Sequence, residues 1–250
     1  MRKKLLVANW KMNTTLHEAI DLADFYKSHL EKNDRVKIIV CPPVIWLEAL
    51  AKKLANSHIE LGAQNIHYLP FGAVTGEVSA AMVKEFAKYV IVGHSERKKF
   101  FHESNEAIHL KVKIAIKNNL VPIVCVGEEL KEEGMDHVLG QVSRAIEGLN
   151  KEEIKKVIFA YEPRWAIGTG EVATADHARW IIDSSRERLA VIYNREIAEN
   201  MKFLYGGSVH SRNINSFLEE KTVDGFLVGG ASLDKIAFEN IYKNLTVNAK

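Results

Sequence analysis

The 250-residue sequence has only two cysteines, Cys41 and Cys125, and they lie far apart. Both sit inside apolar runs, "VKIIVCPP" and "VPIVCVG". We therefore expect buried, reduced thiols in a reducing compartment, and we disfavour a nucleophilic role for either one. The apolar stretch near the amino terminus, "LLVA", is too short for a signal peptide, and no run elsewhere has the length of a membrane span. These features predict a cytoplasmic protein that does not enter a membrane.

An excess of charge of one sign is also missing. The 34 Lys and Arg residues against 32 Asp and Glu residues leave a net charge of +2. No strong overall field therefore draws the protein to nucleic acid or to an anionic membrane. The chain is 47% hydrophobic and 26% charged, with five prolines, which is typical of a globular protein with a sizeable core. Since no low-complexity linker or charge block divides the chain, we predict a single domain over residues 1–250.

Motifs for metal, cofactor and nucleophile chemistry are absent as well. The ten histidines include no H-E-x-x-H pair, and there is no C-x-x-C, G-x-S-x-G or Walker sequence. "GTGEVA" at 168–173 matches a dinucleotide-binding G-x-G-x-x-A pattern, but it starts six residues after Glu162 and not directly after a strand. A second strand that ends in an acidic residue about 20 residues later is also missing. We expect neither a metal nor a cofactor, which leaves acid, base and charge as the available chemistry.

What the sequence does contain is a series of eight short apolar runs. They lie near residues 5–10, 36–42, 59–65, 89–95, 121–127, 156–162, 202–208 and 225–231. The runs are almost continuously apolar, as is typical of parallel strands covered on both faces. Helical patterns separate them, such as the capping-box spacing of Thr15 and Glu18 and the stripe of Leu47, Leu50 and Leu54. Eight strands alternating with helices predict an α/β fold, a closed (β/α)8 barrel, with an open doubly wound sheet as the alternative.

Polar residues and glycines follow these runs at their carboxyl ends, which meet on one face of a parallel barrel. They are Asn9, Lys11, Gln64, Asn65, His94, Ser95, Glu96, Glu162, Ser208, Gly229 and Gly230. After Glu162 comes a long loop with an apolar patch at 165–167 and then glycines, the composition of a lid that excludes water. A carboxylate beneath a lid is a candidate general base, although a Glu at a strand end is more often a surface residue.

Two other side chains in this set suit the stabilisation of an oxygen. His94 precedes Ser95 and Glu96, which look like the first turn of a helix, and unpaired amides there disfavour a protonated imidazole. We therefore interpret His94 as a neutral hydrogen-bond donor, with a structural histidine as an equal alternative. Lys11 could be a solvated lysine at a strand end. If it points into the barrel mouth, its ammonium serves an anionic substrate or an oxyanion.

Paired glycines end the last two runs, in "YGGS" at 205–208 and "VGGAS" at 228–232. They could serve only as tight turns, but loops after strands seven and eight are the usual phosphate site of a barrel, and Ser208 adds a hydroxyl. The residues thus predict a phosphorylated small molecule held by backbone amides and Lys11. Glu162 moves its proton while His94 polarises an oxygen. Such a transfer next to a carbonyl is an isomerisation, and it needs no cofactor.

Over essentially its whole length the sequence resembles the triosephosphate isomerase family, whose fold is the TIM barrel. The motifs "ANWKMN", "GAQN", "GAVTGEVS", "VGHSER", "PIVCVGE", "AYEPRWAIGTG", "LYGGSV" and "GFLVGGASL" follow the family's order and spacing. The resemblance implies interconversion of D-glyceraldehyde 3-phosphate and dihydroxyacetone phosphate through an enediolate, in glycolysis and gluconeogenesis. It also implies site roles, which are Glu162 as the base, His94 as the neutral electrophile, Asn9 and Lys11 as substrate-binding oxyanion partners, Glu96 as a supporting carboxylate, and Gly168, Ser208, Gly229 and Gly230 as phosphate contacts.

The resemblance further implies a homodimer, in which the loop "FGAVTGEVS", with Thr75 near its tip, reaches toward the neighbouring subunit's active site. Three residues depart from the family pattern. Arg164 occupies the first hinge of the lid, where an aliphatic residue is usual, Glu171 stands where lysine is common, and Lys98 stands where a second arginine is common. One alternative is therefore a phosphate-binding barrel whose lid closes poorly and which catalyses little. A barrel aldolase or synthase is disfavoured, because Lys11 has no second lysine nearby to activate it.

Overall fold

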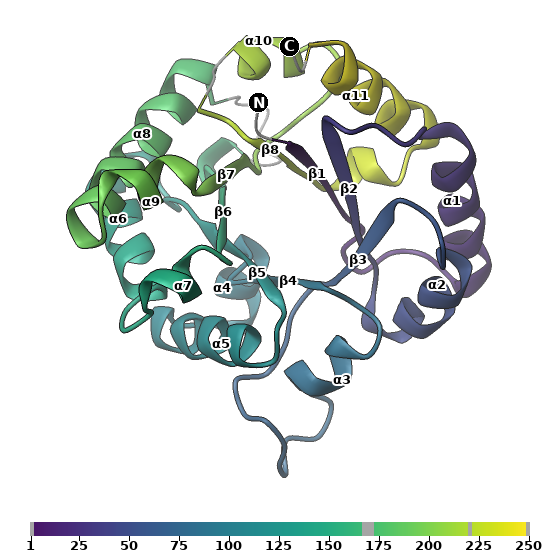
Figure 1. The fold of residues 1–250 in the computed structure, drawn as a ribbon, viewed down its shortest axis with the longest axis horizontal. Coiled ribbons are helices and arrows are strands. Elements are labelled where there is room, and N and C mark those ends of the chain that lie inside the picture. The colour runs from purple at the N-terminus through teal and green to yellow at the C-terminus, as the bar shows by residue number, and fades with distance from the viewer. Residues whose placement is uncertain (1–2, 167–172, 220–221, 249–250) are drawn as a thin grey trace.

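The computed structural model describes residues 3–166, 173–219 and 222–248. Eight parallel strands pair in sequence order, and β1 also pairs with β8, which closes the sheet into a barrel (Figure 1). The strands are β1 (Lys4–Asn9), β2 (Val36–Cys41), β3 (Ile59–Ala63), β4 (Tyr89–Val92), β5 (Val121–Val126), β6 (Ile158–Tyr161), β7 (Lys202–Tyr205) and β8 (Gly225–Val228). The predicted (β/α)8 barrel is confirmed, and the open doubly wound sheet is excluded.

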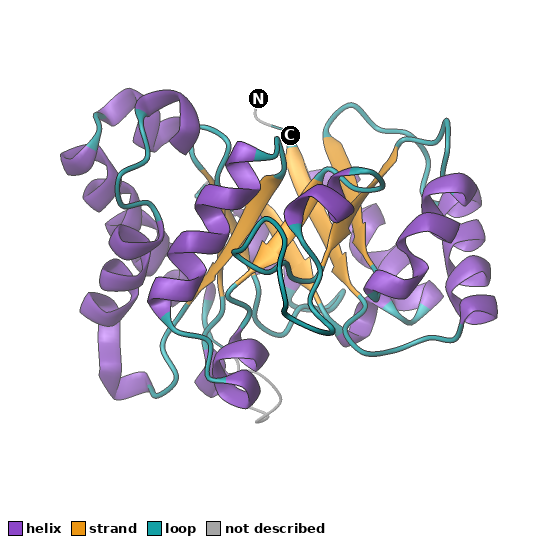
Figure 2. Cartoon of the chain, turned by 90° about the horizontal axis from the view of Figure 1, so that it is seen from below, coloured by secondary structure: helices purple, strands orange, loops and turns teal. Residues whose placement is uncertain are grey.

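Helices surround the barrel and flank it on both sides in the edge view (Figure 2). They are α1 (Leu16–His29), α2 (Leu47–Lys53), α3 (Ala80–Lys84), α4 (Ser95–Phe101), α5 (Asn105–Lys117), α6 (Gly134–Ala145), α7 (Lys151–Ile154), α8 (Ala175–Ile192), α9 (Arg195–Asn200), α10 (Ile214–Glu219) and α11 (Lys235–Asn248). The predicted capping box of α1 is confirmed, because the Thr15 side chain accepts from the Glu18 amide while the Glu18 carboxylate accepts from the Thr15 amide. Local sequence thus sets where this helix begins.

Two apolar layers form the core. One fills the barrel and the other lies between the strands and the helices, as the alternation of side chains along a strand requires. The inner layer contains Leu5, Val7, Ile39, Cys41, Tyr89, Ile91, Ile123, Cys125, Ile158, Ala160, Leu204 and Leu227. Both cysteines are free and buried, as predicted, and burial raises the pKa of both thiols well above the usual value.

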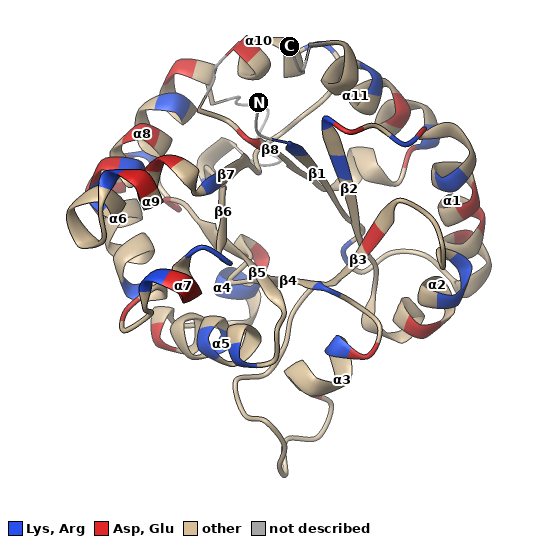
Figure 3. Ribbon diagram, in the orientation of Figure 1, with Lys and Arg blue, Asp and Glu red and all other residues tan. Residues whose placement is uncertain are grey.

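Lys and Arg residues are interspersed with Asp and Glu residues along the helices that surround the barrel (Figure 3). No helix within the described ranges is both long enough and apolar enough to cross a membrane. The segment between β3 and α3, residues 64–79, projects away from the barrel (Figure 1). One closed sheet contains all eight strands, which is consistent with a single domain. The assignment of residues 1–250 to one domain stays a prediction.

Candidate active site

A cavity of about 350 Å³ opens at the carboxyl ends of the strands. Seven of the residues predicted for the site line it, namely Asn9, Lys11, His94, Glu162, Ser208, Gly229 and Gly230. They come from positions that follow or end β1, β4, β6, β7 and β8, so residues far apart in the sequence meet there, as the barrel topology predicts. Glu96 contacts the site through Lys11, and Gly168 and Glu171 lie outside the described residues.

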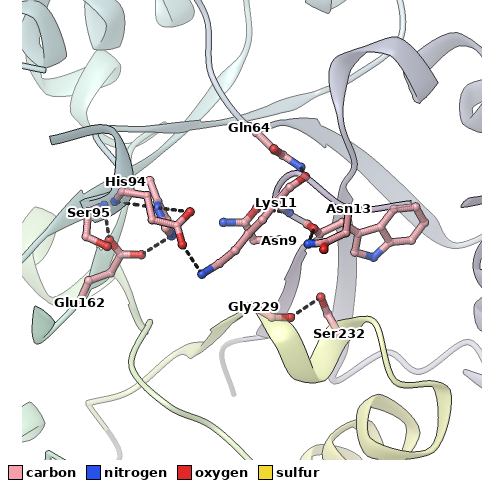
Figure 4. A network of polar contacts seen from close by, with 11 residues as sticks. Asn9, Lys11, Asn13, Gln64, His94, Ser95, Glu162, Gly229 and Ser232 are labelled. Atoms are coloured by element: carbon pink, nitrogen blue, oxygen red, sulfur yellow. Dashed lines mark hydrogen bonds and ion pairs between the residues drawn. The ribbon is translucent and has the colours of Figure 1, made fainter. Parts of the chain in front are cut away.

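Glu162 follows β6 directly, and its side chain is only 2% exposed. Its Oε2 accepts a hydrogen bond from the Ser95 backbone amide at 2.9 Å, and its Oε1 lies 3.1 Å from His94 Nε2 (Figure 4). The surface reading of this glutamate is therefore wrong. A carboxylate held by one amide and one imidazole inside a cavity can accept a proton from a small molecule that enters beside it.

His94 precedes α4, and its Nδ1 accepts a hydrogen bond from the Glu96 amide at 3.2 Å. The predicted helix start at Ser95 is confirmed. Since the amide N–H points at Nδ1, this nitrogen carries a lone pair, and the ring hydrogen is assigned to Nε2. Nε2 lines the cavity side of the ring near Glu162, where it can donate to a substrate oxygen.

Lys11 follows β1 with a left-handed backbone, at φ 54°. Asn9 Oδ1 accepts from the Lys11 amide at 3.1 Å, and the Gln64 side-chain amide donates to the Lys11 carbonyl at 2.8 Å. The Lys11 ammonium lies 2.6 Å from Glu96 Oε1, between β1 and β4 (Figure 4). The side chain thus points into the cavity. Sequence reasoning placed Gln64 at a strand end but missed that it holds this backbone.

Glycines around the cavity make room for these side chains. A Cβ at Gly206 would lie 2.9 Å from Glu162 Cγ, and one at Gly127 would overlap the Glu162 carbonyl oxygen. At Gly229 a Cβ would lie 3.0 Å from Lys11 Cε. Close approach therefore requires glycine at 127, whereas a Cβ at 206 or 229 would press on the side chain of Glu162 or Lys11.

The short helical turn η4 (Gly230–Ser232) follows β8 at the rim of the cavity. The Ser232 hydroxyl donates to the Gly229 carbonyl at 2.7 Å and fixes the turn (Figure 4). Backbone amides at the start of such a turn, together with Ser208 across the cavity, form an environment that suits an anionic group. The predicted phosphate contacts Ser208, Gly229 and Gly230 therefore line one cavity.

A buried carboxylate after β5 escaped the sequence reasoning. Glu128 is 1% exposed, and its Oε1 accepts from the Tyr161 hydroxyl at 2.7 Å and from Trp165 Nε1 at 2.8 Å. Beside it, Arg164 Nη1 lies 3.0 Å from Glu129 Oε2. The loop after β5 therefore holds the turn η3 (Arg164–Ala166) that follows Glu162.

Lys98 lies behind the site on α4. Its ammonium donates to the Cys125 carbonyl at 3.2 Å and to Gln141 Oε1 at 2.9 Å. Gln141 in turn accepts from the Gly127 amide and donates to the Gly127 carbonyl. Desolvation lowers the pKa of Lys98, and nearby acidic groups oppose that shift. At this position the family commonly has an arginine, which can pair with a partner through two parallel hydrogen bonds. The Lys98 ammonium instead makes one hydrogen bond to each of two oxygens.

No group of three or more His, Cys, Asp or Glu side chains in the described part of the chain is arranged to hold a metal ion. An imidazole, a carboxylate and an ammonium at the carboxyl ends of the strands define a barrel enzyme with an acid–base site.

Comparisons with known proteins narrow this class. Residues 4–245 match the sequence model of the triosephosphate isomerase family. The triosephosphate isomerase of Dehalococcoides mccartyi is 44% identical over 251 residues, which cover 99% of this chain and 98% of that protein. The enzyme of Alkaliphilus oremlandii is 43% identical over 96% of this chain and 99% of its own, and that of Lactobacillus delbrueckii subsp. bulgaricus is 40% identical over 93% and 94%. The chain belongs to the triosephosphate isomerase family.

Proposed function

We propose that this member of the family interconverts D-glyceraldehyde 3-phosphate and dihydroxyacetone phosphate by cofactor-free proton transfer, as an aldose–ketose isomerase and intramolecular oxidoreductase, with Glu162 as the base. The observation that carries the proposal is the buried Glu162 carboxylate, 3.1 Å from His94 Nε2 at the wall of the cavity. The two groups stand where one can take a proton from carbon while the other donates to the adjacent oxygen.

In the proposed reaction Glu162 takes a proton from the carbon next to the carbonyl. The electron pair of that C–H bond forms the carbon–carbon double bond of the enediolate, and the carbonyl electron pair moves to oxygen. His94 Nε2–H, Asn9 and the Lys11 ammonium stabilise the negative oxygen. A proton passes from the hydroxyl oxygen to the former carbonyl oxygen, with His94 placed to relay it, and Glu162 returns its proton to the former carbonyl carbon, so that the new carbonyl forms at the carbon that carried the hydroxyl. The Ser95 amide occupies one lone pair of Glu162 Oε2 at 2.9 Å, and the second lone pair of this oxygen can take the substrate proton.

The phosphate of the substrate is proposed to sit against Ser208, Gly229 and Gly230, with Gly168 as a further contact. The exposed start of η4 and the hydroxyl of Ser208 on the cavity wall support this placement. Lys11 supplies the positive charge, and Glu96 orients it through the 2.6 Å ion pair. Closure of the loop after β6 would protect the enediolate from water. No observation favours the alternative of a binding barrel with little catalysis.

We also propose a cytoplasmic homodimer that serves glycolysis and gluconeogenesis and binds neither nucleic acid nor membrane. Thr75 is exposed on the projecting segment 64–79, and Phe71 on the same segment is 84% exposed. Other exposed apolar side chains on loops and helices after β1, β2 and β4 are Met12, Ile45, Phe100 and Phe101. A second subunit can cover apolar side chains of this kind.

The test is conversion of glyceraldehyde 3-phosphate to dihydroxyacetone phosphate, with chelator present, by this protein and by Glu162→Gln. Fast turnover that falls by several orders of magnitude in the variant supports the proposal. Absence of turnover in the unchanged protein, with phosphate ligands still bound, would overturn it in favour of the binding barrel.

A further inference from the structure

In the buried carboxylate of Glu128, one oxygen is close to several hydrogen-bond donors of other residues and the second oxygen is close to none. Besides Tyr161 and Trp165, His177 Nε2 on α8 lies 3.3 Å from Oε1. Oε2 is buried and has no hydrogen-bond partner among the described residues. One oxygen thus faces three donors while the other faces none.

A carboxylate oxygen has two lone pairs in its plane, so three donors on one oxygen compete. The His177 contact is the longest of the three, so the hydrogen bond from this imidazole to Oε1 is the weakest. If His177 takes up a proton, its bond to the carboxylate becomes charge-assisted and shortens. The carboxylate then turns toward His177, and the bond to Trp165 weakens, because both donors use Oε1.

Aromatic rings surround His177 and leave part of it open to water. The ring centroid lies 5.6 Å from that of Trp165, edge-on at 77°, and 5.7 Å from that of Trp180. Its side chain is 26% exposed, so protons can exchange with solvent. The charged and titratable groups on the elements packed here are Glu128, Glu129 and Lys131 after β5, Tyr161 and Arg164 on and after β6, and Asp176 and Arg179 on α8.

The position of Trp165 matters because the chain reaches Glu162 three residues earlier. The Glu162 amide donates to the Val126 carbonyl at 2.8 Å, and the Arg164 amide donates to the Glu128 carbonyl at 3.1 Å. Indole, amides and carboxylate therefore tie the segment that carries the base to the loop after β5. If the Glu128 carboxylate exchanges Trp165 for another donor, the indole hydrogen bond is lost and the two backbone hydrogen bonds of Glu162 and Arg164 remain.

We propose that His177 is a positioning residue which competes with Trp165 for the Glu128 carboxylate. With a neutral imidazole the indole stays bound to Glu128, and with a protonated imidazole the indole is loosened. Because the exchange depends on whether the imidazole carries a second proton, pH is the variable that tests it. The inference rests on the proposed function only in so far as this segment carries the base.

The experiment follows the indole N–H resonance of Trp165 by ¹⁵N NMR in the free protein from pH 5 to pH 8.5, assigned with Trp165→Phe. In the unchanged protein we expect a shift with one midpoint, which matches the midpoint of the His177 ring resonances. His177→Gln keeps a side-chain donor but cannot titrate, so the shift should vanish. His29→Gln on α1 is the control and should retain it, since the contacts of His29 are with Phe25 and Ser28.

Persistence of the Trp165 titration in His177→Gln, or a constant Trp165 resonance in the unchanged protein, would overturn the proposal. If His177→Gln fails to fold, the comparison of the two midpoints in the unchanged protein still decides it, because unequal midpoints contradict it. Kinetics add a second readout, in which His177→Gln should keep kcat within about twofold at pH 8 and show a flatter kcat profile toward pH 6. The NMR readout needs no substrate, so its failure is distinguishable from failure of the isomerase assay.

Discussion

The Lys11 ammonium lies 2.6 Å from the Glu96 carboxylate, although 85 positions separate the two residues in the sequence. The barrel brings them together, since they follow β1 and β4 on the same face of the sheet. Both side chains are partly exposed, at 29% and 44%, so solvent screens the pair and it adds little to stability. Its effect is instead to hold a flexible side chain in one place.

Replacement of Glu96 by Gln should therefore affect catalysis more than stability. We expect kcat/KM to fall at least about tenfold, or about 1.4 kcal/mol, because the ammonium loses its orienting partner. The free energy of unfolding should change by less than about 1 kcal/mol. Glu48→Gln is the control, because it breaks a 2.6 Å pair with Lys52 on the surface of α2 and should leave the kinetics unchanged. Equal kinetic effects of the two changes would contradict the role of Glu96.

Arg164 ties the first turn of the loop after β6 to Glu129, with 13% of its side chain exposed against 57% for its partner. Arg164→Val should change kcat or product release by less than about tenfold, or about 1.4 kcal/mol. A double-mutant cycle with Glu129→Gln, measured by steady-state kinetics at low and high salt, should give a small coupling that salt reduces. A loss of several orders of magnitude would instead show that this hinge residue is essential.

Thr14 adopts φ 78°, which a β-branched residue rarely does, and its buried hydroxyl has no partner among the described residues. Thr14→Gly should relieve this strain. Strain of this kind costs on the order of 1–3 kcal/mol, and glycine costs about 0.5–1 kcal/mol in backbone entropy. We expect a net increase of about 1 kcal/mol in the free energy of unfolding, measured by urea denaturation at fixed protein concentration.

The neighbouring residue provides the contrast for this prediction. Thr15 has φ −77° and caps α1, so Thr15→Ala should lower the free energy of unfolding by about 0.5–2 kcal/mol. If Thr14→Gly is destabilising too, the left-handed threonine is not strained.

Cys41 and Cys125 predict a pH dependence of stability. Burial raises the pKa of both thiols in the folded state, so the folded protein keeps protons that the unfolded chain releases from about pH 8.5 upward. Their contribution is complete below that pH and is lost as the pH rises. Between pH 8.5 and 9.5 the free energy of unfolding should fall by about 2 kcal/mol through the two thiols.

Urea denaturation of the double variant Cys41→Ala, Cys125→Ala checks this slope. The variant starts from a lower stability because it has lost buried volume, but its free energy of unfolding should depend less on pH in this window. A slope equal to that of the unchanged protein would mean that the thiols do not cause it.

Sequence patterns predicted the barrel well because its signals are local. Each apolar run corresponds to a strand, although the run near 89–95 continues past β4, which ends at Val92. His94 and Ser95 come after the strand and are still buried, and Ser95 already begins α4. Apolar character reports burial, and it does not report where a ladder of hydrogen bonds stops.

The contacts around Glu128 could not be predicted in the same way. In the sequence Glu128 opens a charged stretch, "EELKEEG", which resembles a solvated turn. Its partners are Tyr161 on β6, Trp165 in η3 and His177 on α8, 33 to 49 positions away. Lys98 and Gln141 are a similar pair, 43 positions apart. Such residues become neighbours only when the barrel closes, and no local sequence pattern predicts which of them will meet.

The glycines at 127 and 206 have a consequence for redesign of this barrel. Any side chain at Gly127 would overlap the Glu162 carbonyl oxygen, and a Cβ at Gly206 would press on Glu162 Cγ. A library that diversifies the loops after β5 and β7 to accept new substrates must therefore keep these two positions fixed. At Gly230 a Cβ would meet no protein atom within 4 Å, so this position is limited by the proposed phosphate contact and not by packing.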